Sequence, residues 1–193
     1  MNIFRFTVIG LFVLLILFMF AIPKPEIQQE LKNAELPWNI TLHEDGSTEV
    51  FSLRFGTNTL RDAIERFDEP EDMAVYSSAE SSSLETYFGT VNIGPLQAKL
   101  VLTLAASAED IEAILTRARG RAMSSSKDRK IKLDIEDKVL ALDKKFTGIT
   151  FIPKYSGLDS EFFKQRFGEP EAWLRLSESA VQYFYPDKGL SIT

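Results

Sequence analysis

The chain has 193 residues, a net charge of −6, a single histidine and no cysteine. The acidic balance argues against a nucleic-acid-binding surface, which needs a basic face, and the lack of cysteine excludes a disulfide framework and a thiolate zinc site. Hydrophobic residues make up 45% of the chain and charged residues 26%, proportions that are typical of a globular protein.

The N-terminal region contains an uncharged apolar run over residues 6–22. A helix rises 1.5 Å per residue, so this run would span about 25 Å, close to the lower limit for crossing a bilayer. Pro23 and Pro25 follow the run and stop the helix. The sequence therefore predicts a transmembrane signal anchor over residues 1–22, which contacts the membrane through residues 6–22.

A cleaved signal peptide is the alternative interpretation of this region. Ala21 is small, as a cleavage site requires, whereas Met19 is too large for the other small position. For an anchor, a short leading tail and a long following domain favour an N-in, C-out arrangement. We therefore expect a single-pass protein of the inner (cytoplasmic) membrane, with a polar stalk over 23–36 and a C-terminal domain on the periplasmic or extracytoplasmic side.

The first folded unit is expected over residues 37–122 and begins with a β-hairpin. Residues 38–42 alternate apolar and polar side chains, and the following Asp45-Gly46 pair is a signal for a two-residue type I′ turn. A loop of two residues places Ile40 opposite Phe51, with apolar side chains of both strands on one face.

Helix and strand signals follow in this unit. Thr59 and Asp62 have the spacing of a capping box, with apolar residues at helical spacing behind them. Residues 96–105 are mostly apolar, which predicts a strand buried on both faces. The other elements expected in this unit are strands over residues 72–76 and 84–88 and a helix over 108–121.

A connecting segment is expected over residues 123–146 and a second, shorter unit over 147–193. In the connecting segment, Asp134 is a candidate cap for a helix that extends to Lys144. In the second unit, Asp159 is the candidate cap. The elements expected there are strands over residues 147–153, 172–176 and 181–185, with a helix between the first two.

One phrase occurs twice, RFDEPE at residues 66–71 and RFGEPE at 166–171. Such a repeat predicts that one supersecondary unit is used twice. Gly168 stands where a helix ends in a left-handed residue, and Asp68 takes that place in the first copy. We also expect Tyr87-Phe88 to correspond to Tyr183-Phe184. The predicted fold class is thus α+β, with two tandem helix-plus-antiparallel-sheet units behind an N-terminal transmembrane helix.

Each unit resembles the SmpA/OmlA (BamE-like) envelope proteins and the related β-lactamase-inhibitor-protein fold. The residues that carry the resemblance are Phe167-Gly168-Glu169-Pro170 with Tyr183, and more loosely Phe67-Asp68-Glu69-Pro70 with Tyr87. The resemblance covers just under half of the chain and implies a non-enzymatic binding role in the cell envelope. The chain differs from the lipoprotein members because it has no cysteine to acylate and carries two units, so a role in barrel assembly does not follow.

Motifs for chemistry are sparse. His43 could pair with Glu44 or Asp45, but a solvated turn residue is the simpler interpretation. The acidic residues around Glu69 lack the spacing of an EF-hand loop and indicate an acidic turn. Ser124 begins an S-x-x-K sequence, but its companion S-D-N and K-T-G motifs are missing. We therefore expect no catalytic residue, cofactor or metal.

Aromatic residues late in the chain are the candidates for an interaction surface. Trp173, Tyr183 and Tyr185 lie on expected strands, where they could form core or line a binding surface. The leading hypothesis is a non-enzymatic, membrane-anchored envelope protein that binds a partner protein. Two alternatives remain open, an exported soluble inhibitor or ligand-binding protein, and a hydrolase with an unrecognised carboxylate or serine site.

Overall fold

The computed structural model describes residues 36–78, 81–119, 129–155 and 157–193. All of them belong to one compact unit, Glu35–Thr193. The predicted membrane anchor lies outside the described residues, as does the stalk apart from Leu36. Among the described helices, none combines the length and the apolar composition that a bilayer crossing needs.

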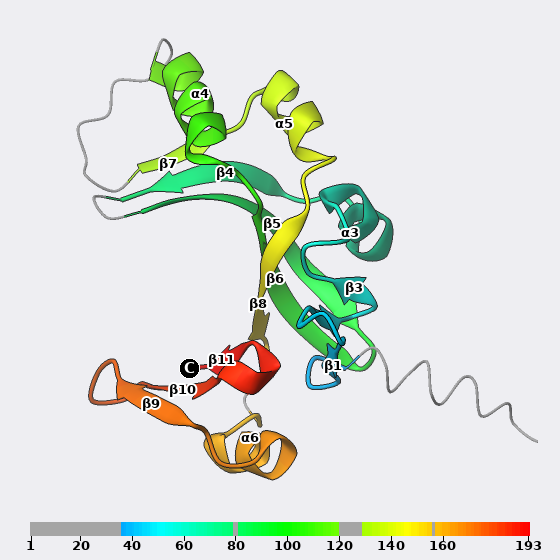
Figure 1. The fold of residues 1–193 in the computed structure, drawn as a ribbon, viewed down its shortest axis with the longest axis vertical. Coiled ribbons are helices and arrows are strands. Elements are labelled where there is room, and N and C mark those ends of the chain that lie inside the picture. The colour runs from blue at the N-terminus through cyan, green and yellow to red at the C-terminus, as the bar shows by residue number, and fades with distance from the viewer. Residues whose placement is uncertain (1–35, 79–80, 120–128, 156) are drawn as a thin grey trace, which may run out of the picture. The chain divides into compact units, whose positions relative to one another are not determined.

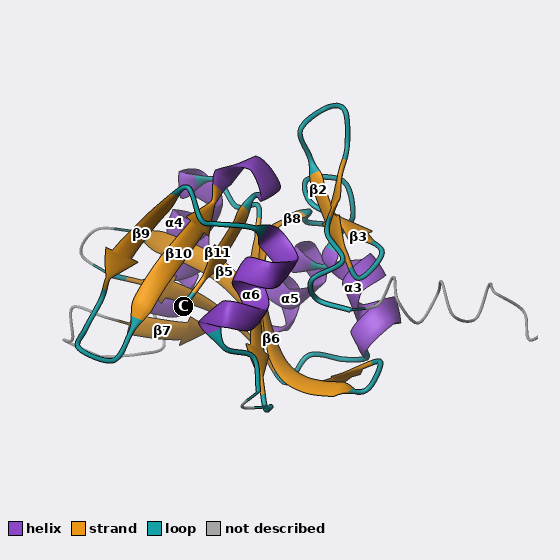
Figure 2. Cartoon of the chain, turned by 90° about the horizontal axis from the view of Figure 1, so that it is seen from below, coloured by secondary structure: helices purple, strands orange, loops and turns teal. Residues whose placement is uncertain are grey.

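The described residues form a mixed α+β fold with antiparallel sheets, as the sequence predicts (Figure 1, Figure 2). The elements in chain order are β1 (Thr41–Leu42), β2 (Thr48–Val50), β3 (Leu53–Arg54), α3 (Leu60–Phe67), β4 (Asp72–Ser77), β5 (Ser82–Ile93), β6 (Leu96–Leu104), α4 (Ala108–Arg119), β7 (Arg129–Lys132), α5 (Ile135–Ala141), β8 (Phe146–Pro153), α6 (Ser160–Phe167), β9 (Ala172–Arg175), β10 (Val181–Tyr185), the 3₁₀ helix η1 (Pro186–Lys188) and β11 (Leu190–Ile192). The sheets that they form have the strand orders β1-β2-β3, β7-β4-β5-β6-β8 and β11-β10-β9.

The N-terminal hairpin forms, but its register differs by one residue from the predicted one. Thr41 lies opposite Glu49, so that Ile40 is not aligned with Phe51. A shift of one residue exchanges the faces on which the side chains of a strand lie. The predicted pairing of Ile40 with Phe51 is therefore wrong.

A longer loop causes this shift. His43 N donates to the Ser47 carbonyl oxygen (2.9 Å), and Gly46 N donates to the His43 carbonyl oxygen (2.9 Å). The loop therefore has three residues, and Gly46 has a φ of +81°, which is typical of a turn that ends in a left-handed residue. The Asp45 carboxylate accepts the Ser47 N–H (3.0 Å) and stabilises this arrangement.

A two-residue turn occurs instead between β2 and β3. Val50 pairs with Leu53, which leaves Phe51 and Ser52 as the turn residues, with φ values of +58° and +62°. Positive φ at both positions is typical of a type I′ turn, where glycine and asparagine are the usual residues. The buried Phe51 ring packs against the Phe67 ring, with 5.9 Å between the centroids, and this packing offsets the backbone strain.

The predicted helix starts are confirmed. The Thr59 side chain accepts the Asp62 backbone N–H, and an Asp62 carboxylate oxygen accepts the Thr59 backbone N–H (2.7 Å), which completes the capping box of α3. Asp134 and Asp159 cap α5 and α6 by accepting a backbone N–H three residues further on, at 2.9 and 2.8 Å. These caps depend on side chains within one turn of the helix.

The main core lies against one face of the five-stranded sheet. Helices α3 and α4 contact this sheet. Leu100 and Leu102 of β6 are fully buried, whereas Gln97 and Lys99 are exposed and Val101 is half-buried. The prediction that this strand is buried on both faces is therefore wrong, because its alternate residues lie on the outer face of the sheet, which is partly exposed.

Two strands from the region after α4 complete the same sheet. Strand β7 pairs with β4, with Ile131 opposite Val75, and β8 pairs with β6, with Ile149 opposite Leu102. The sequence analysis placed β7 in a connecting segment and β8 at the start of the second unit. Both are edge strands of the sheet that β4, β5 and β6 build, because strand pairing depends on residues far apart in the chain.

The C-terminal part consists of α6 and the sheet β11-β10-β9. Strands β9 and β10 form within one residue of their predicted bounds. Strand β11, which the sequence analysis missed, pairs with β10 and places Ile192 opposite Tyr183. Trp38 joins α6 to the N-terminal segment, since its ring lies 5.0 Å from the Phe162 ring and 5.4 Å from the Arg166 guanidinium.

Both copies of the repeated phrase adopt the same local structure. Each ends an eight-residue helix, α3 or α6. The next residue has a positive φ in both copies, +67° at Asp68 and +86° at Gly168, with ψ values of −174° and −171°. The predicted positive φ is confirmed, but the ψ values lie outside the left-handed helical region, in a region that glycine occupies almost alone.

The second strands of the two copies align one residue away from the prediction. Glu71 N donates to the Tyr87 carbonyl oxygen (2.9 Å), and Glu171 N donates to the Phe184 carbonyl oxygen (3.0 Å). Tyr87 therefore corresponds to Phe184, not to Tyr183. Ring contacts beneath the two helices follow the same alignment and join Phe67 to Phe88 (5.8 Å) and Phe167 to Tyr185 (5.7 Å).

Asp68→Gly is expected to raise the free energy of unfolding by about 1 kcal/mol. Strain of roughly 1–3 kcal/mol at such a backbone position is relieved, while glycine adds roughly 0.5–1 kcal/mol of chain entropy to the unfolded state. Urea unfolding of the full chain in detergent micelles, followed by far-UV circular dichroism, measures the change.

The matched control is Gly168→Ala in the second copy. A Cβ at Gly168 would meet no atom within 4 Å. The backbone conformation is therefore the only source of strain in the alanine variant. We expect this variant to lower the free energy of unfolding by about 1–2 kcal/mol. Changes of equal sign in the two variants would contradict the account of both helix ends.

Candidate functional site

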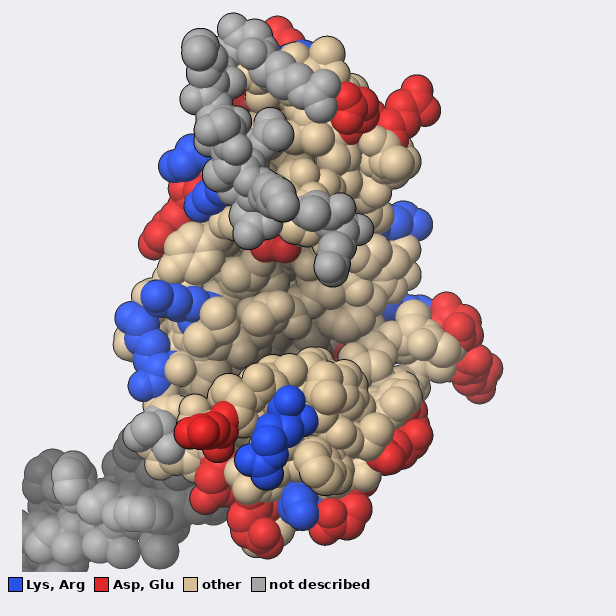
Figure 3. All heavy atoms as spheres, turned by 90° about the vertical axis from the view of Figure 1, so that its left-hand side faces the viewer, with Lys and Arg blue, Asp and Glu red and all other residues tan. Residues whose placement is uncertain are grey.

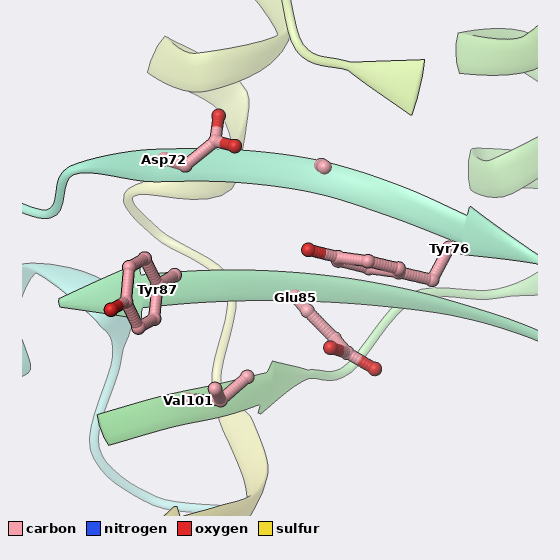
Figure 4. Close-up of a pocket in the computed structure, with 6 residues that line it drawn as sticks. Asp72, Tyr76, Glu85, Tyr87 and Val101 are labelled. Atoms are coloured by element: carbon pink, nitrogen blue, oxygen red, sulfur yellow. The ribbon is translucent and has the colours of Figure 1, made fainter. Parts of the chain in front are cut away.

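The outer face of the five-stranded sheet contains a small hollow of about 50 Å³ that is open to solvent. Alternate residues of a strand lie on one side of a sheet, and the pairing of β4 with β5 brings those of both strands together. Figure 4 shows the resulting group of side chains on the sheet. The hollow is lined by Asp72, Ala74, Tyr76, Glu85, Tyr87 and Val101.

Two lysines of β7 neutralise the carboxylate at this hollow. Lys130 Nζ lies 2.6 Å from an Asp72 carboxylate oxygen and Lys132 Nζ lies 3.6 Å from it. Lys130 Nζ also lies 5.4 Å from the centre of the Tyr76 ring. Burial acts to raise the pKa of Asp72, but the hydrogen bonds and charges of the two lysines outweigh it, so that this pKa lies below its usual value. The hydrogen bond to Asp72 raises the pKa of Lys130.

This arrangement suits charge pairing better than proton transfer. Asp72 and Lys130 are both charged near neutral pH, because each shifts the pKa of the other away from neutrality. A general acid or base works best with a pKa near the working pH. In Figure 4 the Asp72 carboxylate points away from β5, whereas that of Glu85 points toward the β6 side, so that the two acidic groups do not converge.

A second charged pair lies between α4 and α5. The Asp137 side chain is 4% exposed and accepts from the Arg117 guanidinium, with one Nε–Oδ2 distance of 3.4 Å. The hydrogen bond to Asp137 raises the pKa of Arg117. The pair joins two helices that both pack near the core, and a buried carboxylate needs such a partner. We assign it a structural role.

The polar candidates from the sequence do not form a common site. His43 Nε2 lies 2.9 Å from a Glu49 carboxylate oxygen, so that it pairs across the hairpin and not with either residue that follows it. Within the described ranges, no group of three or more His, Asp or Glu side chains is arranged to hold a metal ion. Ser124 and its S-x-x-K sequence lie outside the described residues.

The aromatic candidates divide into surface and interior residues. Trp173 is 62% exposed and lies directly opposite Tyr183, which is half-buried, on the neighbouring strand. Tyr185 is 2% exposed, and its hydroxyl donates to the Gly168 carbonyl oxygen (3.2 Å). Burial also raises the pKa of Tyr185. Tyr185 therefore cannot belong to an interaction surface, and the correction follows from its position beneath α6.

Sequence reasoning missed the exposed neighbours of Trp173 and the residues of the hollow. Leu174 and Leu176 are 53% and 52% exposed, and a strand with apolar residues on both faces was the available signal. The pairing of Asp72 with Lys130 had no local signal, because the two residues meet only through the pairing of β4 with β7.

Comparison with known proteins adds no further constraint on the site. Neither a family model, nor a curated protein, nor a solved structure matches this chain.

Proposed function

We propose that this chain is a non-enzymatic, membrane-anchored protein of the cell envelope that binds a partner protein through the exposed part of its C-terminal sheet, on the face that α6 covers only in part. The apolar run over residues 6–22 supports the anchor. The resemblance of the two helix ends to SmpA/OmlA proteins supports the envelope location. The exposed pair of Trp173 and Tyr183 supports binding.

The observation that carries the proposal is the contrast between the two copies of the repeated unit. Met73, at the position of Trp173 in the first copy, is 6% exposed and belongs to the main core. Helix α4 contacts β4 and contributes Ile111 and Ile114 to the same core, whereas none of the described elements buries Trp173. A large aromatic residue that stays exposed at such a position is typical of an interface centre.

The exposed residues of this strand are mostly uncharged. Ala172, Trp173, Leu174 and Leu176 are exposed, with Arg175 as the charged residue among them. In the lower part of Figure 3, Lys and Arg side chains lie within the uncharged area, and Asp and Glu side chains lie toward its margins. Aromatic residues together with arginine are enriched at protein–protein interfaces.

Photo-crosslinking in the native membrane tests the proposal. A photoreactive amino acid at position 173 of the full chain is expected to give one reproducible protein adduct, which Tyr183→Ala reduces by about tenfold. The matched control is position 139 on α5, where Val139 is 58% exposed and no adduct is expected. Equal adducts at both positions would contradict a specific surface.

Alkaline carbonate washing of the same membranes tests the anchor. A transmembrane segment stays in the bilayer when peripheral contacts are removed, so that we expect the chain in the pellet. Release into the supernatant would favour the exported soluble protein instead.

A further inference from the structure

Strand β9 is an open edge in a position that the first copy fills. In the C-terminal sheet the order is β11-β10-β9, so none of the described strands lies on the other side of β9. Strand β4, its counterpart in the first copy, is covered on that side by β7. Leu133 N donates to the Met73 carbonyl oxygen (2.9 Å) there, and Trp173 has the corresponding position in β9.

The hydrogen-bonding groups on this edge can be identified. Leu176 N donates to the Ala180 carbonyl oxygen on the β10 side (3.0 Å). Antiparallel ladders direct the groups of alternate residues to alternate sides. The backbone N–H and C=O groups of Trp173 and Arg175 therefore point to the open edge, where a further strand would bind them.

The edge has few of the features that normally prevent strand pairing. Edge strands are commonly protected by proline, lysine, a bulge or a covering element. Residues 172–176 read Ala-Trp-Leu-Arg-Leu, without proline or lysine, and all five are exposed. An exposed apolar edge of this kind is a template for another strand.

We propose that this edge pairs with the same edge of a second copy of the chain, antiparallel and centred on Leu174. The five residues are self-complementary in this register. Trp173 lies opposite Arg175 of the second copy on one face, which forms a cation–π pair twice. On the other face, Leu174 lies opposite Leu174 of the second copy, and Ala172 opposite Leu176. Such an interface is closed by a two-fold axis.

Neighbouring registers are less favourable. The edge groups belong to residues 173 and 175, so only shifts of two residues keep both strands hydrogen-bonded. A shift toward the C-terminus places Arg175 opposite Arg175 of the second copy, where like charges repel. A shift toward the N-terminus requires the N–H of Glu171, which already donates to the Phe184 carbonyl oxygen (3.0 Å).

The inference concerns the edge of β9 and therefore goes beyond the proposed binding by the face of the sheet. A ladder of five residues buries a small surface compared with stable interfaces, which bury roughly 1,200 Å² or more. We expect a weak dimer that a covalent trap can capture. The chain has no cysteine, so each introduced thiol reports only on its own position.

The test uses single-cysteine variants of the full chain in its native membrane, oxidised with copper phenanthroline and analysed on non-reducing gels. Leu174→Cys is expected to form a disulfide dimer, because residues opposite each other at such a pair are about 4.5 Å apart between Cα atoms. Leu176→Cys is the matched control with equal exposure. In this register the Cα atoms of residue 176 in the two copies would be about 13 Å apart along the strands. We therefore expect at least fivefold less dimer than with Leu174→Cys.

Two further arms keep the result independent of any one variant. A mixture of Ala172→Cys and Leu176→Cys chains should form the mixed dimer, while each variant alone should form at least fivefold less dimer. Arg175→Pro removes an N–H that faces the open edge and spares the β9–β10 ladder, so that it should abolish the Leu174→Cys dimer, whereas Arg175→Ala should only weaken it.

Absence of dimer at both Leu174→Cys and the mixed pair would overturn the inference, as would equal trapping at Leu174→Cys and Leu176→Cys. The photo-crosslinking at position 173 gives a separate result for the proposed function. An adduct with a different protein without any disulfide dimer would support the binding face and refute the edge pairing. A disulfide dimer without such an adduct would support the edge pairing and refute the binding face.

Discussion

Phe51→Ala is expected to lower the free energy of unfolding by about 3–5 kcal/mol, the largest loss that we predict. The Phe51 side chain is 1% exposed, and its ring lies 5.9 Å from that of Phe67 and 6.1 Å from that of Phe151. These contacts join the β2–β3 turn to α3 and to β8. Alanine has the same backbone strain at a φ of +58°, so that the loss reports the cavity and the missing contacts.

Urea unfolding of the full chain in detergent micelles measures this loss as a lower midpoint at an unchanged slope. Phe51→Leu keeps most of the volume and is expected to cost less than about 1.5 kcal/mol. Leu176→Ala, at a residue that is 52% exposed, is the surface control and should stay within about 0.5 kcal/mol of the parent chain. A loss for Phe51→Ala as small as that of the surface control would refute the packing role of this ring.

Thr86→Val is expected to stabilise the protein by about 1–2 kcal/mol. Thr86 is 0% exposed, and its Oγ1 atom has no hydrogen-bond partner among the described residues. The residue lies opposite Met73 on one neighbouring strand and Leu102 on the other, on the face of the sheet that holds the core. Valine has nearly the same shape, so it fills the site without leaving a buried hydroxyl group unsatisfied.

Thr90→Val in the same strand is the matched control, since Thr90 is exposed. We expect its free energy of unfolding to stay within about 0.5 kcal/mol of the parent chain. The same urea titration compares both variants. A lower midpoint for Thr86→Val would show that the hydroxyl is satisfied, as a buried water could do.

The proposed binding surface could be predicted only in part. Trp173 and Tyr183 were identified from their residue types, and the pairing of β9 with β10 places them opposite each other. Tyr185 has the same alternation in the same strand, yet it is buried because Phe167 of α6 packs on it. Alternation shows which residues share a face, but it does not show how far a helix extends over that face.

Local chemistry fixed the ends of the helices in this protein. The side-chain caps at Thr59, Asp134 and Asp159 and the positive φ at Asp68 and Gly168 depend on residues within one turn. The two copies of the repeated phrase adopt the same structure for this reason.

Tertiary structure decided the register of the first hairpin, the membership of β7 and β8 in one sheet, and the pairing of Asp72 with Lys130. Each depends on contacts between strands, whose energies come from side chains that meet only after folding. The open edge of β9 belongs to this group as well. Its sequence is that of an ordinary apolar strand, and only the sheet order shows that no other described strand lies on one of its sides.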